Sequence, residues 1–322
     1  MEEAKRSEHL IDSEIKGIID EMGSMSLTPE NYLVVREQLK AFFSSDVRER
    51  YDVEIEEVWI DNLFDNSKVR LVITKPKNIE KQLNPFIYSM HGGGMIVGSP
   101  ELDHEKHAFL AHHYHFVAVS VDYRLAPEFS QPAQLYDCYS GIKWCIDHAE
   151  ELNIDTEKVA VFGESAGSGL AGGLALFIRD QQEFNIQHLR LSVPMLDDRT
   201  AIKEAHPFNG EYFFNHTIND FGWKSVLNQK PGTEGISEYY SPGRANNLKG
   251  LPSTYLCVGS IELFADETLD FAKQLMYDGV PVELHLYPGY HHLGLSVPEA
   301  YHAKRENENS LNALLRALKI KE

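Results

Sequence analysis

The spacing of apolar residues changes near residue 50, and the change predicts two kinds of element. Before that point they recur every three or four positions, so we predict helices over residues 8–45. Thr28-Pro29-Glu30 combines an N-cap residue, a proline and an acid, as at a helix start, and that helix extends to about residue 43. From residue 52 apolar and polar positions alternate, which predicts two strands with a turn at Asp65-Asn66-Ser67.

Short, continuous apolar runs dominate the rest of the chain, and segments with helical spacing separate most of them. The runs are residues 85–90, 116–121, 159–162, 189–193, 254–258 and 282–286. The segments with helical spacing include residues 134–149, 266–278 and 307–319. Runs of this type are typical of strands buried on both faces, and their alternation with helices predicts an α/β fold with a mostly parallel sheet.

Residues 196–247 interrupt this alternation with a segment rich in aromatic residues. We interpret it as a lid inserted into the core, and the alternative is one more helical layer. The expected domains are N-terminal cap helices over 1–50, a first core part over 51–195, a cap insertion over 196–247 and a second core part over 248–322.

Composition and charge exclude several classes of protein. The 322 residues are 43% hydrophobic and 25% charged, as in ordinary globular domains, and no apolar run approaches a membrane span. The formal net charge of -19 repels nucleic acid and anionic lipid, so neither is an expected partner. Three cysteines form no disulfide framework and no secretory signal is visible, so we expect a cytoplasmic protein.

A candidate nucleophile lies in Gly163-Glu164-Ser165-Ala166-Gly167, between an apolar run and a helix rich in small residues. This G-x-S-x-G pattern in a strand–turn–helix context is that of a nucleophile elbow, which projects Ser165 at the helix start. The Ala166 N–H then points to where an oxyanion would form. The alternative interpretation is an ordinary Gly-Ser turn that begins a helix.

The same stretch also matches a dinucleotide-binding pattern. Residues 167–172 read G-x-G-x-x-G, but four residues separate them from the strand and no acid follows about 20 residues later. We therefore interpret these glycines as allowing close contact between helix and sheet.

A second glycine-rich motif, His91-Gly92-Gly93-Gly94, follows the run at 85–90. Consecutive glycines leave backbone N–H groups free to donate, so Gly93, Gly94 and Ala166 are the predicted oxyanion-hole donors. The alternative is a merely flexible loop.

Together these motifs resemble the hormone-sensitive-lipase family of α/β-hydrolase esterases. Further matches are Tyr123-Arg124-Leu125-Ala126-Pro127-Glu128 and Tyr287-Pro288-Gly289-Tyr290-His291-His292, and residues 194–199 resemble a segment of the bacterial acetyl-esterase-like members. The motifs run in family order from about residue 50 to 300. The resemblance implies a sheet of eight strands, a helical cap and no cofactor.

The acid of a Ser-acid-His triad follows a late strand in this fold. The family position, usually Asp, falls here on Glu262, whose side chain is one methylene longer. Asp266 is the alternative, although as a first-turn acid it would also suit a helix N-terminus.

The general base predicted from the family register is His292, three residues after Gly289, and His291 is its rival. Neighbouring side chains in a loop point apart, so only one of them can face Ser165. The alternative for either is a surface loop histidine. Three aromatic residues of the insertion, Phe213, Phe214 and Trp223, are the predicted lining of the substrate pocket.

Other titratable residues receive structural interpretations. His104, His107, His112, His113 and His115 lack metal-ligand spacing, so we read them as a solvated helix face and expect no metal site. Arg124, Glu128 and Asp198 are interpreted as ion-pair residues beneath the site. The run at 306–309 is interpreted as the solvated start of the last helix.

These observations predict a serine carboxylesterase that hydrolyses small-molecule esters with short acyl chains, from acetyl to about hexanoyl. The alternatives are a lactonase, amidase or peptidase with the same triad, or a relative that only binds a ligand. The run at 282–286 is expected to be an edge strand, which makes a homodimer possible.

Overall fold

An eight-stranded sheet organises the computed structural model, which describes residues 5–22, 26–42, 46–77, 83–204 and 206–320. The strand order is β1-β2-β4-β3-β5-β6-β7-β8. β1 pairs with β2 and β2 with β4 in antiparallel fashion, and every pair from β4 to β8 is parallel. The predicted α/β fold with a mostly parallel sheet is confirmed.

The bounds of the elements match most of the predicted segments. The strands are β1 Val53–Asp61, β2 Lys68–Pro76, β3 Asn84–Met90, β4 Val117–Asp122, β5 Ile154–Glu164, β6 His188–Ser192, β7 Ser253–Gly259 and β8 Val282–Tyr287. The helices are α1 Lys16–Met22, α2 Tyr32–Phe42, α3 His104–Tyr114, α4 Ala133–Asp147, α5 Ala149–Leu152, α6 Ala166–Gln181, α7 His216–Leu227, α8 Ala265–Tyr277 and α9 Tyr301–Ala317.

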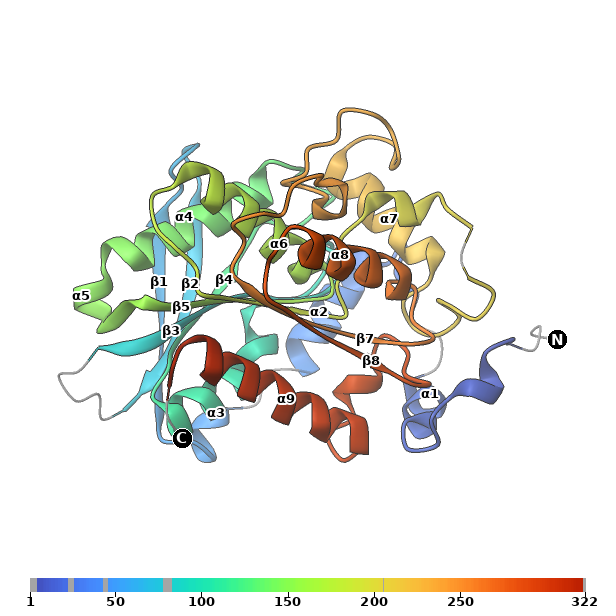
Figure 1. The fold of residues 1–322 in the computed structure, drawn as a ribbon, viewed down its shortest axis with the longest axis horizontal. Helices are drawn as coiled ribbons and strands as arrows, with labels where there is room; N and C mark the ends of the chain where they lie inside the picture. The colour runs from blue at the N-terminus through green and yellow to red at the C-terminus, as the bar shows by residue number, and fades with distance from the viewer. Residues whose placement is uncertain (1–4, 23–25, 43–45, 78–82, 205, 321–322) are drawn as a thin grey trace.

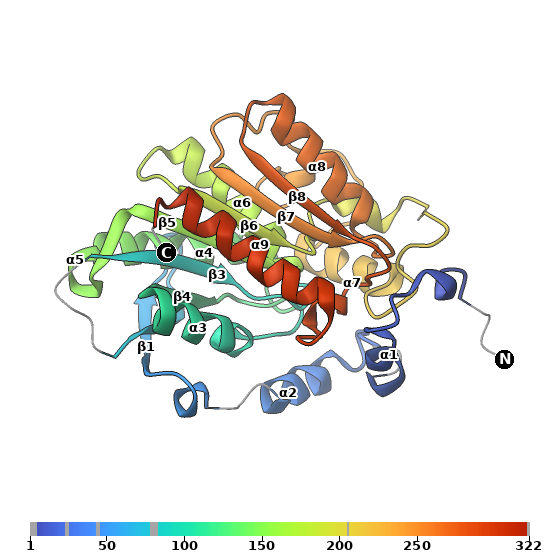
Figure 2. The same ribbon diagram turned by 60° about the horizontal axis from the view of Figure 1, so that its bottom comes forward.

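Helices cover both faces of the sheet. α3 and α9 lie side by side on one face, whereas α4, α6 and α8 cover the other (Figures 1 and 2). Both faces of the central strands are therefore buried, and β3, β4 and β7 are mostly apolar, as expected for such strands. β8 is an edge strand, as the sequence predicts.

The N-terminal region departs from the helices predicted over residues 8–45. It contains two short helices, α1 and α2, and residue 43, the predicted end of the second, lies outside the described residues. Side-chain contacts hold α2 against the core, because Arg36 donates to the carbonyl oxygens of Ile96 and Ala126 at 2.6 and 2.7 Å and pairs with Glu128 at 2.8 Å. The helix therefore lies against the loop that follows β3.

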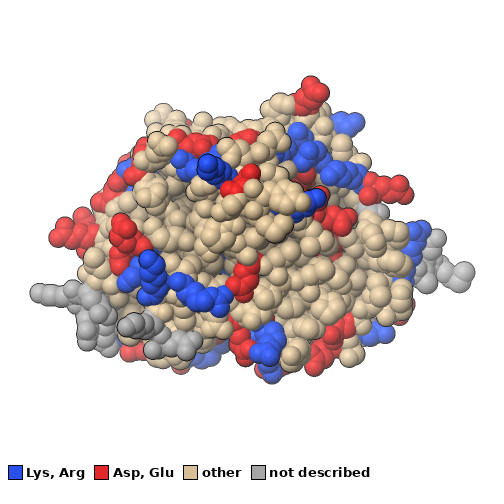
Figure 3. Space-filling view, in the orientation of Figure 1, with Lys and Arg blue, Asp and Glu red and all other residues tan. Residues whose placement is uncertain are grey.

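The last helix begins earlier than the sequence predicts. α9 starts at Tyr301, so residues 306–309 lie inside it, and the interpretation of this run as a solvated helix start is wrong for Glu306. Glu306 is buried because its Oε1 lies 2.7 Å from Nη2 of Arg190 on β6. Acidic and basic side chains are interspersed on the face drawn in Figure 3. Within the described ranges, no helix combines the length and apolar character that a membrane span requires.

Candidate active site

Ser165 lies on a strained turn between β5 and α6. Its φ is 53° and its ψ is -119°, a conformation that a residue with a side chain rarely adopts and that is typical of a nucleophile elbow. The turn is sharp because Gly163 and Gly167 leave no room for a Cβ: one at Gly163 would overlap the Gly167 carbonyl, and one at Gly167 would overlap that of Met90. The Ser165 N–H also donates to the Ser192 carbonyl at 2.9 Å, which ties the elbow to β6.

Three side chains from distant parts of the chain form one hydrogen-bonded series. The Ser165 Oγ lies 2.8 Å from Nε2 of His292, and His292 Nδ1 lies 2.6 Å from Oε1 of Glu262. Since a carboxylate only accepts, Nδ1 carries the proton and Nε2 is left to accept from the Ser165 hydroxyl. Only 5% of Ser165 and 8% of His292 are exposed, so the series is largely shielded from water.

The two candidate acids lie in different environments. Glu262 is buried in the turn after β7 and contacts the imidazole, whereas Asp266 is exposed in the first turn of α8. The geometry therefore brings Glu262, rather than Asp266, to His292.

His291 is buried beside His292 and is not the surface residue that one interpretation predicted. Its ring packs against Phe213 at 4.8 Å and Tyr212 at 5.9 Å between ring centroids, away from Ser165. Burial, with smaller effects of His292 and Lys5, lowers its pKa to about 4. A neutral His291 thus packs with Tyr212 and Phe213.

The glycine loop after β3 passes directly beside the elbow. A Cβ placed on Gly92 would lie 3.3 Å from that of Ser165, and Gly93 and Gly94 adopt φ values of 116° and 64°. Among the described residues, the N–H groups of Gly93, Gly94 and Ala166 donate to no protein acceptor. Unpaired backbone N–H groups of this kind are the donors that stabilise an oxyanion in acyl transfer.

His91 and Tyr123 support this loop, a role that the motifs alone did not assign. The His91 Nδ1 donates to the Gly92 carbonyl at 2.7 Å, and the Tyr123 hydroxyl donates to the His91 carbonyl at 2.7 Å. The two rings stack at 4.3 Å. Burial lowers the pKa of His91, so the ring is neutral and acts as a structural donor.

The three aromatic residues predicted to line the pocket lie at different places. The Phe214 ring packs on His292 at 5.0 Å between centroids, and it lies 3.6 Å from a Cβ placed on Gly94. Phe213 packs on His291 and joins a cluster with Ile11 and Ile18 of the N-terminal region. Trp223 is fully buried in the main core.

Several titratable residues outside this hydrogen-bonded series have structural partners. His107 is buried, so the prediction of a solvated residue is wrong for it. Its Nε2 donates to the Ser89 hydroxyl at 2.9 Å. Burial lowers the pKa of His107 to about 4. The three residues interpreted as ion-pair residues have separate partners: Arg124 pairs with Asp137 at 2.8 Å, Glu128 with Arg36, and Asp198 with Arg244 at 2.5 Å. No group of three potential metal ligands occurs within the described ranges.

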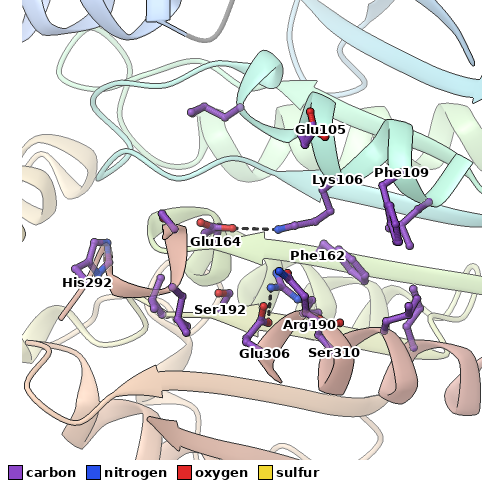
Figure 4. A pocket seen from close by; sticks show the side chains of 18 of the residues that line it. Glu105, Lys106, Phe109, Phe162, Glu164, Arg190, Ser192, His292, Glu306 and Ser310 are labelled. Carbon is purple, nitrogen blue, oxygen red and sulfur yellow. Dashed lines mark hydrogen bonds and ion pairs between the residues drawn. The ribbon is translucent and has the colours of Figure 1, made fainter. Parts of the chain in front are cut away.

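A cavity of about 510 Å³ reaches His292 from the face of the sheet that α3 and α9 cover (Figure 4). Its floor is formed by alternate residues of β5 and β6, and its two walls are formed by the helices. No sequence motif predicts this cavity, because it exists only where three distant segments meet.

Comparisons with known proteins bear on the fold and the family of the chain. A family model described as alpha/beta hydrolase fold matches residues 87–295. The carboxylesterase NlhH of Mycobacterium tuberculosis is 31% identical over 248 residues, which cover 73% of this chain and 74% of that protein. The arylesterase of Saccharolobus solfataricus is 32% identical over 209 residues, 63% of this chain and 66% of that protein.

A solved structure of a bacterial heroin esterase has a similar arrangement over almost its whole length. Its TM-score is 0.89 at 29% identity, and the match covers 96% of this chain and 98% of that one.

Proposed function

Because this chain belongs to the α/β-hydrolase family of hormone-sensitive-lipase-like carboxylic ester hydrolases, we propose that Ser165, His292 and Glu262 are its catalytic triad. The observation that carries the proposal is the hydrogen-bonded series from the Ser165 hydroxyl through the imidazole to the buried carboxylate. The substrates are small-molecule esters.

In the first half of the reaction, His292 Nε2 takes the Ser165 proton as Oγ attacks the ester carbonyl carbon. Glu262 holds the Nδ1–H tautomer and stabilises the imidazolium that forms. His292 then gives the proton to the alcohol oxygen as the bond between that oxygen and the carbonyl carbon breaks. The alcohol leaves and the acyl group remains on Ser165.

In the second half, a water molecule loses a proton to His292 and its oxygen attacks the acyl carbon. The bond to Ser165 Oγ breaks, Oγ recovers the proton from Nε2, and the carboxylic acid is released. In both halves the carbonyl oxygen becomes an anion. The N–H groups of Gly93, Gly94 and Ala166 stabilise it, and each such donor is typically worth about 3 kcal/mol.

The position of Phe214 supports a preference for short acyl groups. Its ring lies beside both Gly94 and His292, so it limits the space next to the carbonyl carbon of a bound ester. We propose acetyl to about hexanoyl esters as substrates, with Phe214 as the residue that limits chain length. Phe213 packs on His291 and Trp223 is buried in the main core, so we do not assign either of them to the limit on chain length.

The test is a series of p-nitrophenyl esters, from acetate to decanoate, with the wild type and Ser165→Ala. We expect the wild type to hydrolyse the short esters fastest and the variant to lose about 10⁴-fold or more in kcat. Hydrolysis by Ser165→Ala at the wild-type rate would refute the triad, and equal rates along the series would refute only the chain-length preference.

A further inference from the structure

We propose that the cavity between α3 and α9 binds the alcohol part of the ester, and that this alcohol is extended, uncharged and apolar. The proposal rests on the proposed function, since it requires His292 to act as general base and acid. We call the cavity the α3–α9 groove. It is lined along its length by Lys106, Phe109, Phe162, Arg190, Glu306 and Ser310 (Figure 4).

The position of His292 in the groove decides which part of the ester can enter it. His292 lies at one end of the lining (Figure 4). The oxyanion donors Gly93, Gly94 and Ala166 do not line it. The leaving oxygen must lie beside His292 Nε2 to receive its proton, whereas the carbonyl oxygen must lie at the glycine loop. A group that extends from His292 into the groove is therefore attached to the leaving oxygen.

The charges of the groove favour an uncharged occupant. Lys106 pairs with Glu164 at 3.2 Å and Arg190 pairs with Glu306 at 2.7 Å, so both cations of the lining already have partners. A carboxylate on the alcohol would have to compete with these two glutamates.

The shape and the far end of the groove favour an extended apolar chain. Along α9 the lining runs from Glu306 to Leu314, and eight residues of helix span about 12 Å. Beyond the two ion pairs, the lining includes the apolar residues Phe109, Phe162 and Leu311 beside the polar Asn307 and Ser310. Part of this apolar surface is open, since 37% of Phe109 is exposed. An alkyl chain that covers it would gain binding energy roughly in proportion to the area buried.

The experiment uses two esters of identical composition, octyl acetate and ethyl octanoate, with ethyl acetate as the short reference. Ser310→Trp on α9 fills the groove from one wall. Asn312→Trp is the matched control, because Asn312 is exposed two residues along the same helix and does not line the groove. Phe109→Ala removes apolar surface from the opposite wall, and its exposure makes it compatible with folding.

The proposal predicts that Ser310→Trp lowers kcat/KM for octyl acetate by roughly tenfold or more, the scale of a lost apolar contact in a pocket. In Ser310→Trp, kcat/KM for ethyl acetate and for ethyl octanoate should stay near that of the wild type. Asn312→Trp should leave kcat/KM unchanged for all three esters. Phe109→Ala should also lower the ratio of kcat/KM for octyl acetate to kcat/KM for ethyl acetate.

Two results would overturn the proposal. If Ser310→Trp lowered kcat/KM for ethyl octanoate instead of octyl acetate, the groove would bind the acyl part of the ester. If neither groove variant changed the ratio of kcat/KM for octyl acetate to kcat/KM for ethyl acetate, the groove would not bind substrate at all. Failure of the proposed function gives a different result, namely that Ser165→Ala retains activity on ethyl acetate.

Discussion

The guanidinium of Arg190 and the carboxylate of Glu306 form an ion pair at 2.7 Å in which both side chains are buried, although 116 positions separate them in the sequence. The pair joins β6, whose last residue accepts the Ser165 N–H, to α9. It thus connects the C-terminal helix to the strand that supports the elbow.

Replacing Glu306 with Ala should destabilise the fold strongly. The change leaves Arg190 charged and buried without its partner, which typically costs about 3–5 kcal/mol. Urea unfolding measures the free energy of unfolding. The control is Glu308→Ala on the same helix, where an exposed pair with Arg305 is lost and no measurable change is expected. If Glu306→Ala and Glu308→Ala lowered the free energy of unfolding by similar amounts, burial of the Arg190–Glu306 pair would be unimportant for stability.

Glu267 should make stability depend on pH in an unusual direction. Burial raises the pKa of this carboxyl well above its ordinary 4.5, although Thr200 and the Leu196 N–H donate to it. The folded protein therefore holds a proton that the unfolded chain loses above about pH 4.5. Its contribution to stability falls as pH rises, by up to about 1.4 kcal/mol per pH unit until the folded carboxyl ionises.

Glu267→Gln removes this titration and keeps a carbonyl acceptor for the Leu196 N–H. We expect the variant to be more stable than the wild type at pH 8, and the difference in free energy of unfolding to shrink toward pH 5. Urea unfolding of both proteins at several pH values measures it. A difference that stays constant across this range would contradict the raised pKa.

The two candidate acids can be separated by activity. Glu262→Ala should lower kcat by about 10⁴-fold, because the imidazole loses the partner that fixes its tautomer and balances its charge. Asp266→Ala should leave kcat unchanged, since Asp266 is exposed at the start of α8. Steady-state hydrolysis of p-nitrophenyl acetate measures both. A large loss of kcat in Asp266→Ala with no loss in Glu262→Ala would reassign the role of the acid to Asp266.

Phe214 should set the limit on acyl-chain length. Phe214→Ala opens space beside Gly94, so the ratio of kcat/KM for hexanoate to that for acetate should rise, roughly tenfold for p-nitrophenyl esters. Phe213→Ala is the matched control, because that ring packs on His291. Both variants remove a buried phenyl ring and should lose stability by about 3–5 kcal/mol. An unchanged ratio in Phe214→Ala would remove this residue from the pocket.

The sequence predicts the strands and the turns at the glycine motifs because the physical causes of these structures are local. Strands buried on both faces are usually apolar, and the elbow needs small residues at Gly163 and Gly167 whatever surrounds it. The same holds for the loop at Gly93 and Gly94. These short patterns point to Ser165, whereas the choice of Glu262 and His292 over Asp266 and His291 depends on the resemblance to the family.

What the sequence could not predict depends on partners far along the chain. Glu306 is charged, and only the presence of Arg190 on β6 explains why it is buried. His107 is likewise buried because Ser89 receives its hydrogen bond. The α3–α9 groove has no local signal, since its floor and walls come from separate segments.

Covalent labelling with a fluorophosphonate tests the central claim most directly, because this reagent reacts with a serine activated by a neighbouring imidazole. Mass spectrometry of the digested protein should find one adduct, on the peptide that contains Ser165, with loss of activity in proportion to labelling. Inactivation with the adduct on another residue, or full activity after complete labelling of Ser165, would contradict the account.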